Sequence, residues 1–328
     1  MRRIIGLTLA VLGVLLIAAA VSLPTWVSSQ VIKFPLDENQ TATLAASNAS
    51  YFSQKALTER TGVTIVATYT IKGEPSKGSS SVAVWDQLST VTDVTNHEQI
   101  SQQTRTFAFD RRTAQLVDCC GASLNGDKSV HQTGMLGSVF PFGTQKQAYQ
   151  VYDTTLKRTA PFAYTGSSTV NGIPVYEFTE DVAPTQVATL PIPGALLGLK
   201  AAVVTMGEFD QIHQVYYVDP ETGALLNVHE HQIVTLRDPA TRAVAKVLYD
   251  ADLTVTPETL TKVTALDSSG RNTIALLTTI LPIVLGIVGG VALVAGIFLA
   301  RGRRSGERSG DGTQVSAAAA GSPAPGEH

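Results

Sequence analysis

The stretch QVYYVDPETGALLNVHEHQ, residues 214–232, decides the fold class because it has the pattern of two β-strands joined by a tight turn. Apolar and polar residues alternate on both sides of the turn, which is the period of a strand with one face on a core. Within the turn, Pro220 fixes its own φ, Asp219 can hydrogen-bond the turn backbone, and Gly223 accommodates a positive φ. We therefore expect a β-hairpin here.

Similar alternating runs fill the middle of the 328-residue chain, among them VTIVATYTIKG (63–73), QTRTFAFDRRTAQLVDCCG (103–121) and AVAKVLYDADLTV (243–255). Helical periodicity is scarce and is best at TATLAASNASYFSQKALTERT (41–61) and PETLTKVTALDSSGR (257–271). The pattern predicts an α+β domain that is mostly antiparallel β-sheet.

Two stretches of this domain resemble each other. FAFDRRTAQLVDC (107–119) and YYVDPETGALLNV (216–228) both have an aromatic residue, then Asp, then Thr, then a β-run. One interpretation is an internal duplication, with related subdomains at about 24–135 and 136–257. The other is that similar hairpins recur in any β protein.

Two long apolar segments lie at the ends of the chain, and each is long enough to cross a bilayer. The first covers residues 1–23 and begins Met1-Arg2-Arg3; it fits either a retained anchor or a cleaved signal peptide. The second covers residues 272–300, and its glycines at 286, 289 and 290 suit either close helix packing or the general tolerance of Gly in membrane helices. These segments predict two transmembrane helices that flank the β-rich domain at 24–271.

Positive charge lies on the same side of both apolar segments, at Arg2-Arg3 and at RGRR (301–304). By the positive-inside rule we expect a two-pass plasma-membrane protein with both termini cytoplasmic and the domain at 24–271 outside. The tail at 301–328 is rich in Gly, Ser, Ala and Pro, which predicts a disordered cytoplasmic segment. The net charge of −3 does not favour a nucleic-acid partner. The two apolar segments make the lipid bilayer the expected partner.

Histidines and cysteines provide the first candidate site residues. His229 and His231 would lie on one face of a strand, with His213 on the partner strand; this is a weak candidate metal site or a solvated face, and no metal or other cofactor is predicted. Cys119 and Cys120 are the only cysteines. Outside the membrane we expect them to form a vicinal disulfide that caps a turn, with a redox switch or an intermolecular bridge as alternatives.

Two further stretches are candidates for ligand contact. GSVFPFGTQKQAYQVYDTTL (137–156) combines aromatic and polar residues, and we expect either a loop entering a strand or a recognition surface using Phe142, Tyr149, Tyr152 and Asp153. TLPIPGALLGLKAAV (189–203) is apolar but too short to span a bilayer, so Leu196 and Leu197 belong either to a core loop or to an exposed apolar lid.

Four motifs together carry a resemblance that covers nearly the whole chain: LPTWVSSQVIKFPLDENQTATL (23–44), PFGTQKQAYQVYDTTL (141–156), NGIPVYEFTE (171–180) and YYVDPETGALLN (216–227). The sequence resembles an actinobacterial family of envelope proteins labelled porin-A-like, a domain of unknown function between two membrane anchors. The resemblance implies a cell-envelope protein of mycolic-acid-type bacteria. It also implies a link, known for some members, to lipomannan and lipoarabinomannan maturation or export.

The expected function is therefore non-enzymatic: the external domain binds a lipid-linked glycan or another envelope membrane protein and assists lipoglycan transport or maturation. No catalytic motif is present, which favours this interpretation over a glycan-modifying enzyme; a structural subunit of a membrane complex is a further alternative. Pore formation is not expected, because the strands are rich in Thr, Asp and Gln rather than continuously apolar on one face.

Overall fold

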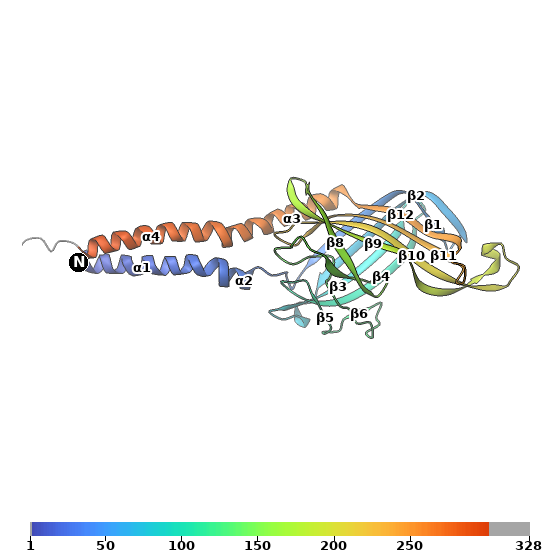
Figure 1. The fold of residues 1–328 in the computed structure, drawn as a ribbon, viewed down its shortest axis with the longest axis horizontal. Coiled ribbons are helices and arrows are strands. Elements are labelled where there is room, and N and C mark those ends of the chain that lie inside the picture. The colour runs from blue at the N-terminus through green and yellow to red at the C-terminus, as the bar shows by residue number, and fades with distance from the viewer. Residues whose placement is uncertain (1, 302–328) are drawn as a thin grey trace, which may run out of the picture. The chain divides into compact units, whose positions relative to one another are not determined.

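The computed structural model describes residues 2–301 and divides them into two compact units (Figure 1). One unit contains the described residues up to Leu23 and those from Leu281 onward, and the other runs from Pro24 to Ile280. The C-terminal segment 302–328, including nearly all of the predicted tail, lies outside the described residues.

The first unit is a packed pair of helices, α1 (Arg2–Ser22) and α4 (Leu281–Ala300). Glycines let the two backbones approach closely: a Cβ added to Gly296 would lie 2.4 Å from the amide nitrogen of Ala10, and one added to Gly13 would lie 2.6 Å from the carbonyl oxygen of Gly289. Gly286 and Gly290 face open space. Of the three glycines considered from sequence, only Gly289 therefore serves close helix packing.

Two helices in the described residues are long and apolar enough to cross a membrane, spanning Arg2–Val27 and Pro257–Ala300. The first extends through a π-helical turn at Leu23–Val27, and the short α2 (Ser28–Val31) follows. The second includes α3 (Pro257–Ala275) and a π-helical turn at Leu276–Ile280. The prediction of one such helix near each end is confirmed.

In the described residues, twelve strands form one antiparallel sheet in the second unit. The strands are β1 (Asn39–Ser53), β2 (Thr58–Gly73), β3 (Val82–Asp93), β4 (Glu98–Asp110), β5 (Leu116–Val117), β6 (Ser123–Leu124), β7 (Tyr149–Asp153), β8 (Arg158–Val170), β9 (Ile173–Pro193), β10 (Val203–Val218), β11 (Leu225–Arg237) and β12 (Val244–Val255). Their order is β5-β4-β3-β2-β1-β12-β11-β10-β9-β8-β7, and β6 pairs with β4. The first and last strands are therefore neighbours in the middle of the sheet.

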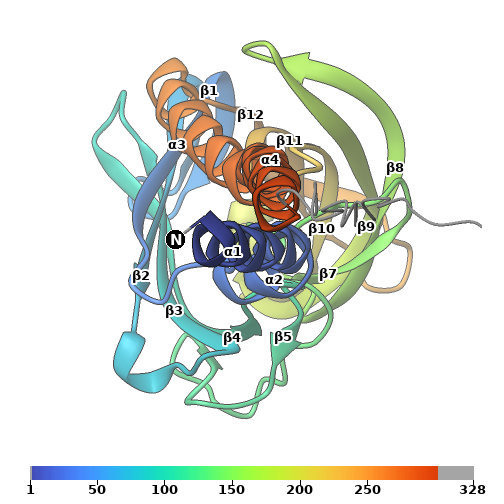
Figure 2. The ribbon, with the colours of Figure 1, turned by 90° about the vertical axis from the view of Figure 1, so that its left-hand side faces the viewer.

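The sheet curves into a half-barrel around an interior, as Figure 2 shows. A short segment at 134–136 joins its two edges. On one side Leu116 donates to the carbonyl of Gly134 and Leu136 donates to the carbonyl of Ala114; on the other, Met135 donates to Gln150 and accepts from Tyr152. Because both edges are paired at this point, the segment closes part of the rim and leaves less free edge for unwanted pairing.

The predicted helix at 41–61 is wrong, because this stretch forms β1, a turn and the start of β2. Alanines suggested a helix, but Leu44, Ala46 and Tyr51 face the core from a strand that pairs on both sides, with β2 and β12. Asn48 has a φ of 60°, within a break in the register. Tertiary pairing here overrides local propensity.

The predicted helix at 257–271 is confirmed by α3. Thr256 lies just before it with extended backbone, and its side chain accepts a hydrogen bond from the Thr259 amide, while Pro257 occupies the first turn. Both are standard signals for a helix start.

One five-residue turn recurs between strands. At 110–114 and 219–223 the first residue is an aspartate whose side chain accepts from turn amides, and the fifth residue, Ala114 or Gly223, has a φ of 57° or 74°. The same pattern occurs at 93–97, 153–157 and 238–242. A shared turn thus accounts for the similarity of 107–119 and 216–228, and the division into two subdomains stays a prediction.

Candidate functional site

A cavity of about 460 Å³ lies on the concave face of the half-barrel. Its walls combine apolar side chains with polar ones, of which Arg105, Tyr152, Glu180 and Gln214 are buried. The apolar set includes Leu44, Tyr69, Ile71, Val91, Phe162, Ile212, Tyr216 and Val228, and the polar set includes Gln87, Ser89, Gln103, Arg105, Ser138, Tyr152, Asp153, Glu180, Gln214, Glu230 and Gln232. This volume and mixture are typical of a site for a small molecule.

Strand register places two glutamates in one row on this wall. Gln214 of β10 is opposite Glu180 of β9 on one side and opposite Glu230 of β11 on the other. With neighbouring strands about 4.8 Å apart, the backbones that carry the two glutamates are roughly 10 Å apart. Gln214 donates from its side-chain amide to Oε2 of Glu180, so the row contains two carboxylates separated by an amide.

Burial governs the protonation of this row. It raises the pKa of Glu180 to about 7, an effect opposed by the Gln214 hydrogen bond. It also raises the pKa of Glu230 to about 7, assisted by the charges of Asp210, Asp153 and Glu180. Asp210 is itself buried, with a pKa of about 6. The carboxyl groups of this low-dielectric wall are therefore partly protonated near neutral pH.

Arg105 of β4 provides the opposite charge in the same cavity. Its side chain is 6% exposed, and Nε donates to Oε1 of Gln132 at 2.6 Å. The guanidinium lies over the rings of Phe107 and Tyr152, at 4.8 and 5.4 Å from their centroids. Burial lowers its pKa to about 10, so the group remains cationic at neutral pH. Aromatic faces stabilise such a cation without neutralising it.

Only part of the sequence-predicted ligand set lies at this cavity. Tyr152 and Asp153 line it. Tyr149 packs in an aromatic cluster with Phe140 and Phe178, and its hydroxyl accepts from the Gln145 amide.

Phe142 lies elsewhere, against Phe34 in a second cavity of about 380 Å³. Leu196 and Leu197 are in a 3-10 turn (Gly194–Leu197) at the tip of the β9–β10 hairpin. Leu196 and Leu197 are themselves half-buried, and neighbouring Leu199 of this segment is half exposed. Whether it contacts lipid stays a prediction.

Arg105, Glu180 and Glu230 were missed by the sequence reasoning. The signal was available for Glu230: in the run His229-Glu230-His231, strand alternation places the glutamate on the face opposite the histidines. For Arg105 and Glu180 there was no such signal. A lone charged residue in a strand is expected to face solvent until its neighbours across the sheet are known.

The histidines lie on the outer face of the sheet, each beside a different aspartate. The nearest nitrogen–oxygen distances are 2.5 Å for His213–Asp181, 2.8 Å for His229–Asp252 and 3.1 Å for His231–Asp250. His213 is directly opposite His231 in the register. Within residues 2–301 no group of three His, Cys, Asp or Glu side chains is close enough to hold a metal ion.

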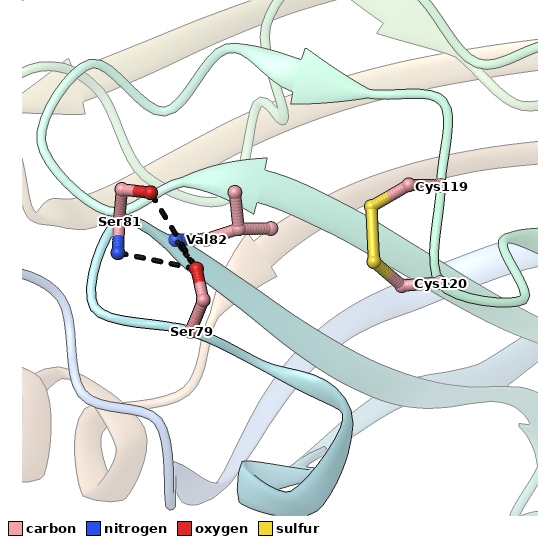
Figure 3. The surroundings of a disulfide bond; sticks show 5 residues. All are labelled: Ser79, Ser81, Val82, Cys119 and Cys120. Carbon is pink, nitrogen blue, oxygen red and sulfur yellow. Dashed lines mark hydrogen bonds between the residues drawn. A yellow bond between two sulfur atoms is a disulfide. The ribbon is translucent and has the colours of Figure 1, made fainter.

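Cys119 and Cys120 are joined by a disulfide in the loop between β5 and β6 (Figure 3). Cys120 and Gly121 both have positive φ, at 63° and 86°. The Cys119 amide donates to the carbonyl of Val117, and its own carbonyl accepts from Ala122. The bond thus lies within a tight turn, away from the residues that line the cavity.

A family model described as Porin PorA matches residues 5–298. The chain belongs to this porin family. No curated protein matches the chain. The match covers both apolar helices and the whole sheet, and it supports a membrane protein in contact with lipid.

Family membership overturns the predicted function. We expected a lipoglycan-handling protein and discounted pore formation, but the family is one of porins and nothing supports lipoglycan transport. Pore formation was discounted because strands that face lipid need an apolar outer face. The structure has separate apolar helices, α1 and α4, so polar strands are no evidence against membership of a porin family.

Proposed function

We propose that this porin-family protein is anchored in the membrane by its apolar helices and that its half-barrel cavity admits small polar solutes. The observation that carries the proposal is the cavity itself: the buried polar side chains Arg105, Gln214 and Glu180 line a space large enough for a small solute. Burying polar groups is costly unless they have partners, and a passing hydrophilic solute or its water provides them.

The test is a conductance measurement on the full chain reconstituted in planar bilayers. Gln103 of β4 lines the cavity, whereas its neighbour Gln102 lies on the opposite face of the same strand. Gln103→Trp fills part of the cavity and is expected to reduce single-channel conductance at least 2-fold, and Gln102→Trp is the matched control. Wild-type protein that produces no current above that of empty bilayers would overturn the proposal.

We further propose the two-pass topology, with both termini cytoplasmic and residues 24–271 outside the plasma membrane. Arg2 and Arg3 are the first residues of α1, and in the sequence Arg301, Arg303 and Arg304 follow α4. Positive charge retained on one side supports this orientation. Single cysteines introduced at exposed Leu57 and Leu199, in a Cys119→Ser/Cys120→Ser background, should react with a membrane-impermeant maleimide on intact cells; protection of both would contradict it.

A further inference from the structure

Unpartnered polar atoms gather in the half-barrel cavity. Within the described residues, six buried side-chain nitrogen or oxygen atoms have no hydrogen-bond partner. Four of them belong to residues that line this one cavity: Nη2 of Arg105, Oγ of Ser138, Oη of Tyr152 and Oε1 of Glu180. Buried polar groups are nearly always satisfied in folded proteins, so a concentration of unsatisfied ones points to a binding site for a polar ligand.

Arg105 and Tyr152 form the hydrogen-bond-donating end of the cavity. Arg105 is 6% exposed, uses Nε for Gln132, and has Nη2 free. Among the described ion pairs none involves this guanidinium. The Tyr152 hydroxyl is a second unused group, and its ring lies 5.4 Å from the guanidinium carbon. A guanidinium with an adjacent phenol suits a carboxylate or a similar planar anion.

An acceptor end lies on another wall of the same cavity. Glu180 is 1% exposed, and Oε2 accepts from Gln214 while Oε1 is free. Glu230 is two strands away in the same row. Neither glutamate has a cationic partner among the ion pairs of the described residues. A carboxylate that is buried and half-satisfied suits an ammonium group, which carries three donors.

The two ends do not neutralise each other. Arg105 of β4 lies over the ring of Tyr152 in β7, and no ion pair within residues 2–301 joins it to Glu180 of β9. A buried cation and a buried anion without partners each carry a desolvation cost. A single ligand with both charges would offset the cost at both ends at once, whereas a simple cation or anion would offset only one.

From this arrangement we infer that the cavity binds a small zwitterion, a free amino acid or a compound like it. Its carboxylate lies at Arg105 and Tyr152, and its ammonium group lies at Glu180 and Glu230. The carbon chain between them contacts the apolar wall, which includes Ile212 and Val228. The inference rests on the proposed function, because it names the solute class for the same cavity.

The test is isothermal titration of the full chain in detergent with amino acids of graded length. The probes are glycine, 4-aminobutyrate, 6-aminohexanoate and L-leucine, and the single-charge controls are butyrate and butylamine. At least one zwitterion is expected to bind 10-fold or more tightly than both controls. If no zwitterion binds, or if a control binds as tightly as the best zwitterion, the inference is overturned.

Substitutions then assign the two ends. Glu180→Gln is expected to weaken zwitterion binding at least 10-fold and leave butyrate binding unchanged. Tyr152→Phe removes only the unused hydroxyl and is expected to weaken zwitterion binding about 3-fold, with butylamine binding unchanged. Asp181→Asn is the matched control, because Asp181 follows Glu180 in β9 and lies beside His213 on the outer face; it should leave binding intact. A loss with Asp181→Asn equal to that with Glu180→Gln would contradict the assignment.

The binding and conductance results are separable. Zwitterion binding without conductance would overturn the proposed solute passage and leave the binding site standing. Conductance without zwitterion binding would overturn this inference and leave the passage standing.

Discussion

Arg271 of α3 and Asp219 of the β10–β11 turn form an ion pair, with 2.7 Å between Nη1 and Oδ2. The Asp219 carboxylate is fully buried, and the same guanidinium contacts Oε2 of Glu221 at 3.0 Å. The pair joins a turn of the sheet to a helix 52 residues further along the chain. It therefore fixes α3 to the half-barrel at the Asp219–Gly223 turn, whose residues predicted the β-hairpin.

Arg271→Gln should destabilise the protein by about 3 kcal/mol, because removal of one partner leaves the other as a buried, unpaired charge. Thermal unfolding of the full chain in detergent measures the effect. The matched control is Lys262→Gln on the same helix, which breaks an exposed pair with Glu258 at 2.8 Å and should cost less than about 1 kcal/mol. Equal effects of the two substitutions would contradict the account.

Carboxyl groups in the cavity wall and beside it should make stability fall as pH rises. In the folded protein, burial raises the pKa of Glu180 and Glu230 to about 7 and that of Asp210 to about 6, whereas unfolded Glu and Asp titrate near 4. Between about pH 4 and pH 7 the folded state therefore holds more protons than the unfolded state, so the free energy of unfolding decreases with increasing pH.

Glu230→Gln should weaken this pH dependence, since it removes one of the three groups. We expect the difference in stability between pH 5 and pH 8 to shrink by roughly 1 to 2 kcal/mol. The melting temperature at both pH values, for wild type and variant, provides the measurement. Glu59→Gln, at an exposed position of β2, is the control. An unaltered pH profile in Glu230→Gln would show that this glutamate does not retain its proton on folding.

Gly134→Ala should detach the segment that joins the two edges of the half-barrel. Gly134 has a φ of 79°, and a Cβ there would lie 2.6 Å from the carbonyl oxygen of Gln150. Gly126 has nearly the same φ, 80°, but faces open space. Both alanine variants carry the backbone strain, and only Gly134→Ala also clashes, so we expect it to cost about 2 kcal/mol more. Hydrogen exchange should show faster exchange at the amides of Leu116 and Tyr152; slow exchange there would contradict the bridging role.

Gly296→Val should separate α1 from α4, because its Cβ would collide with the Ala10 amide at 2.4 Å. Gly290→Val is the control, since nothing lies within 4 Å of a Cβ at that position. We expect the first variant to lose about 1 to 3 kcal/mol of helix-pair stability and the second to lose little. The distance between spin labels on single cysteines introduced at exposed Leu12 and Val291, in a Cys119→Ser/Cys120→Ser background, reports the pairing. An unchanged distance in Gly296→Val would contradict the packing.

Local signals in the sequence predicted much of the fold. The turn chemistry of Asp219–Gly223, the period-two runs and the apolar ends are each contained in a few consecutive residues, and all three appear in the structure. The segment at 41–61 failed because its conformation depends on two partner strands, one of them about 200 residues away in the sequence. Helix propensity carries no information on such pairing.

The candidate site was predictable only in part for the same reason. Tyr152 and Asp153 were found because they belong to a stretch of mixed composition. Glu180 and Glu230 come together through the register of β9, β10 and β11, and Arg105 faces the same cavity from β4. For Arg105 and Glu180 the telling property is a buried atom without a hydrogen-bond partner, and that property cannot be seen in a sequence.

The pairing of β1 with β12 in the middle of the sheet has a consequence for biosynthesis. Of the strands described, β1 is the first to leave the ribosome, yet one of its two neighbours is the last. Until β12 emerges, β1 presents a long unpaired flank that can recruit other chains. The sheet therefore cannot be completed until Val255 has left the ribosome, and we expect a nascent chain that needs protection by a holdase up to that point.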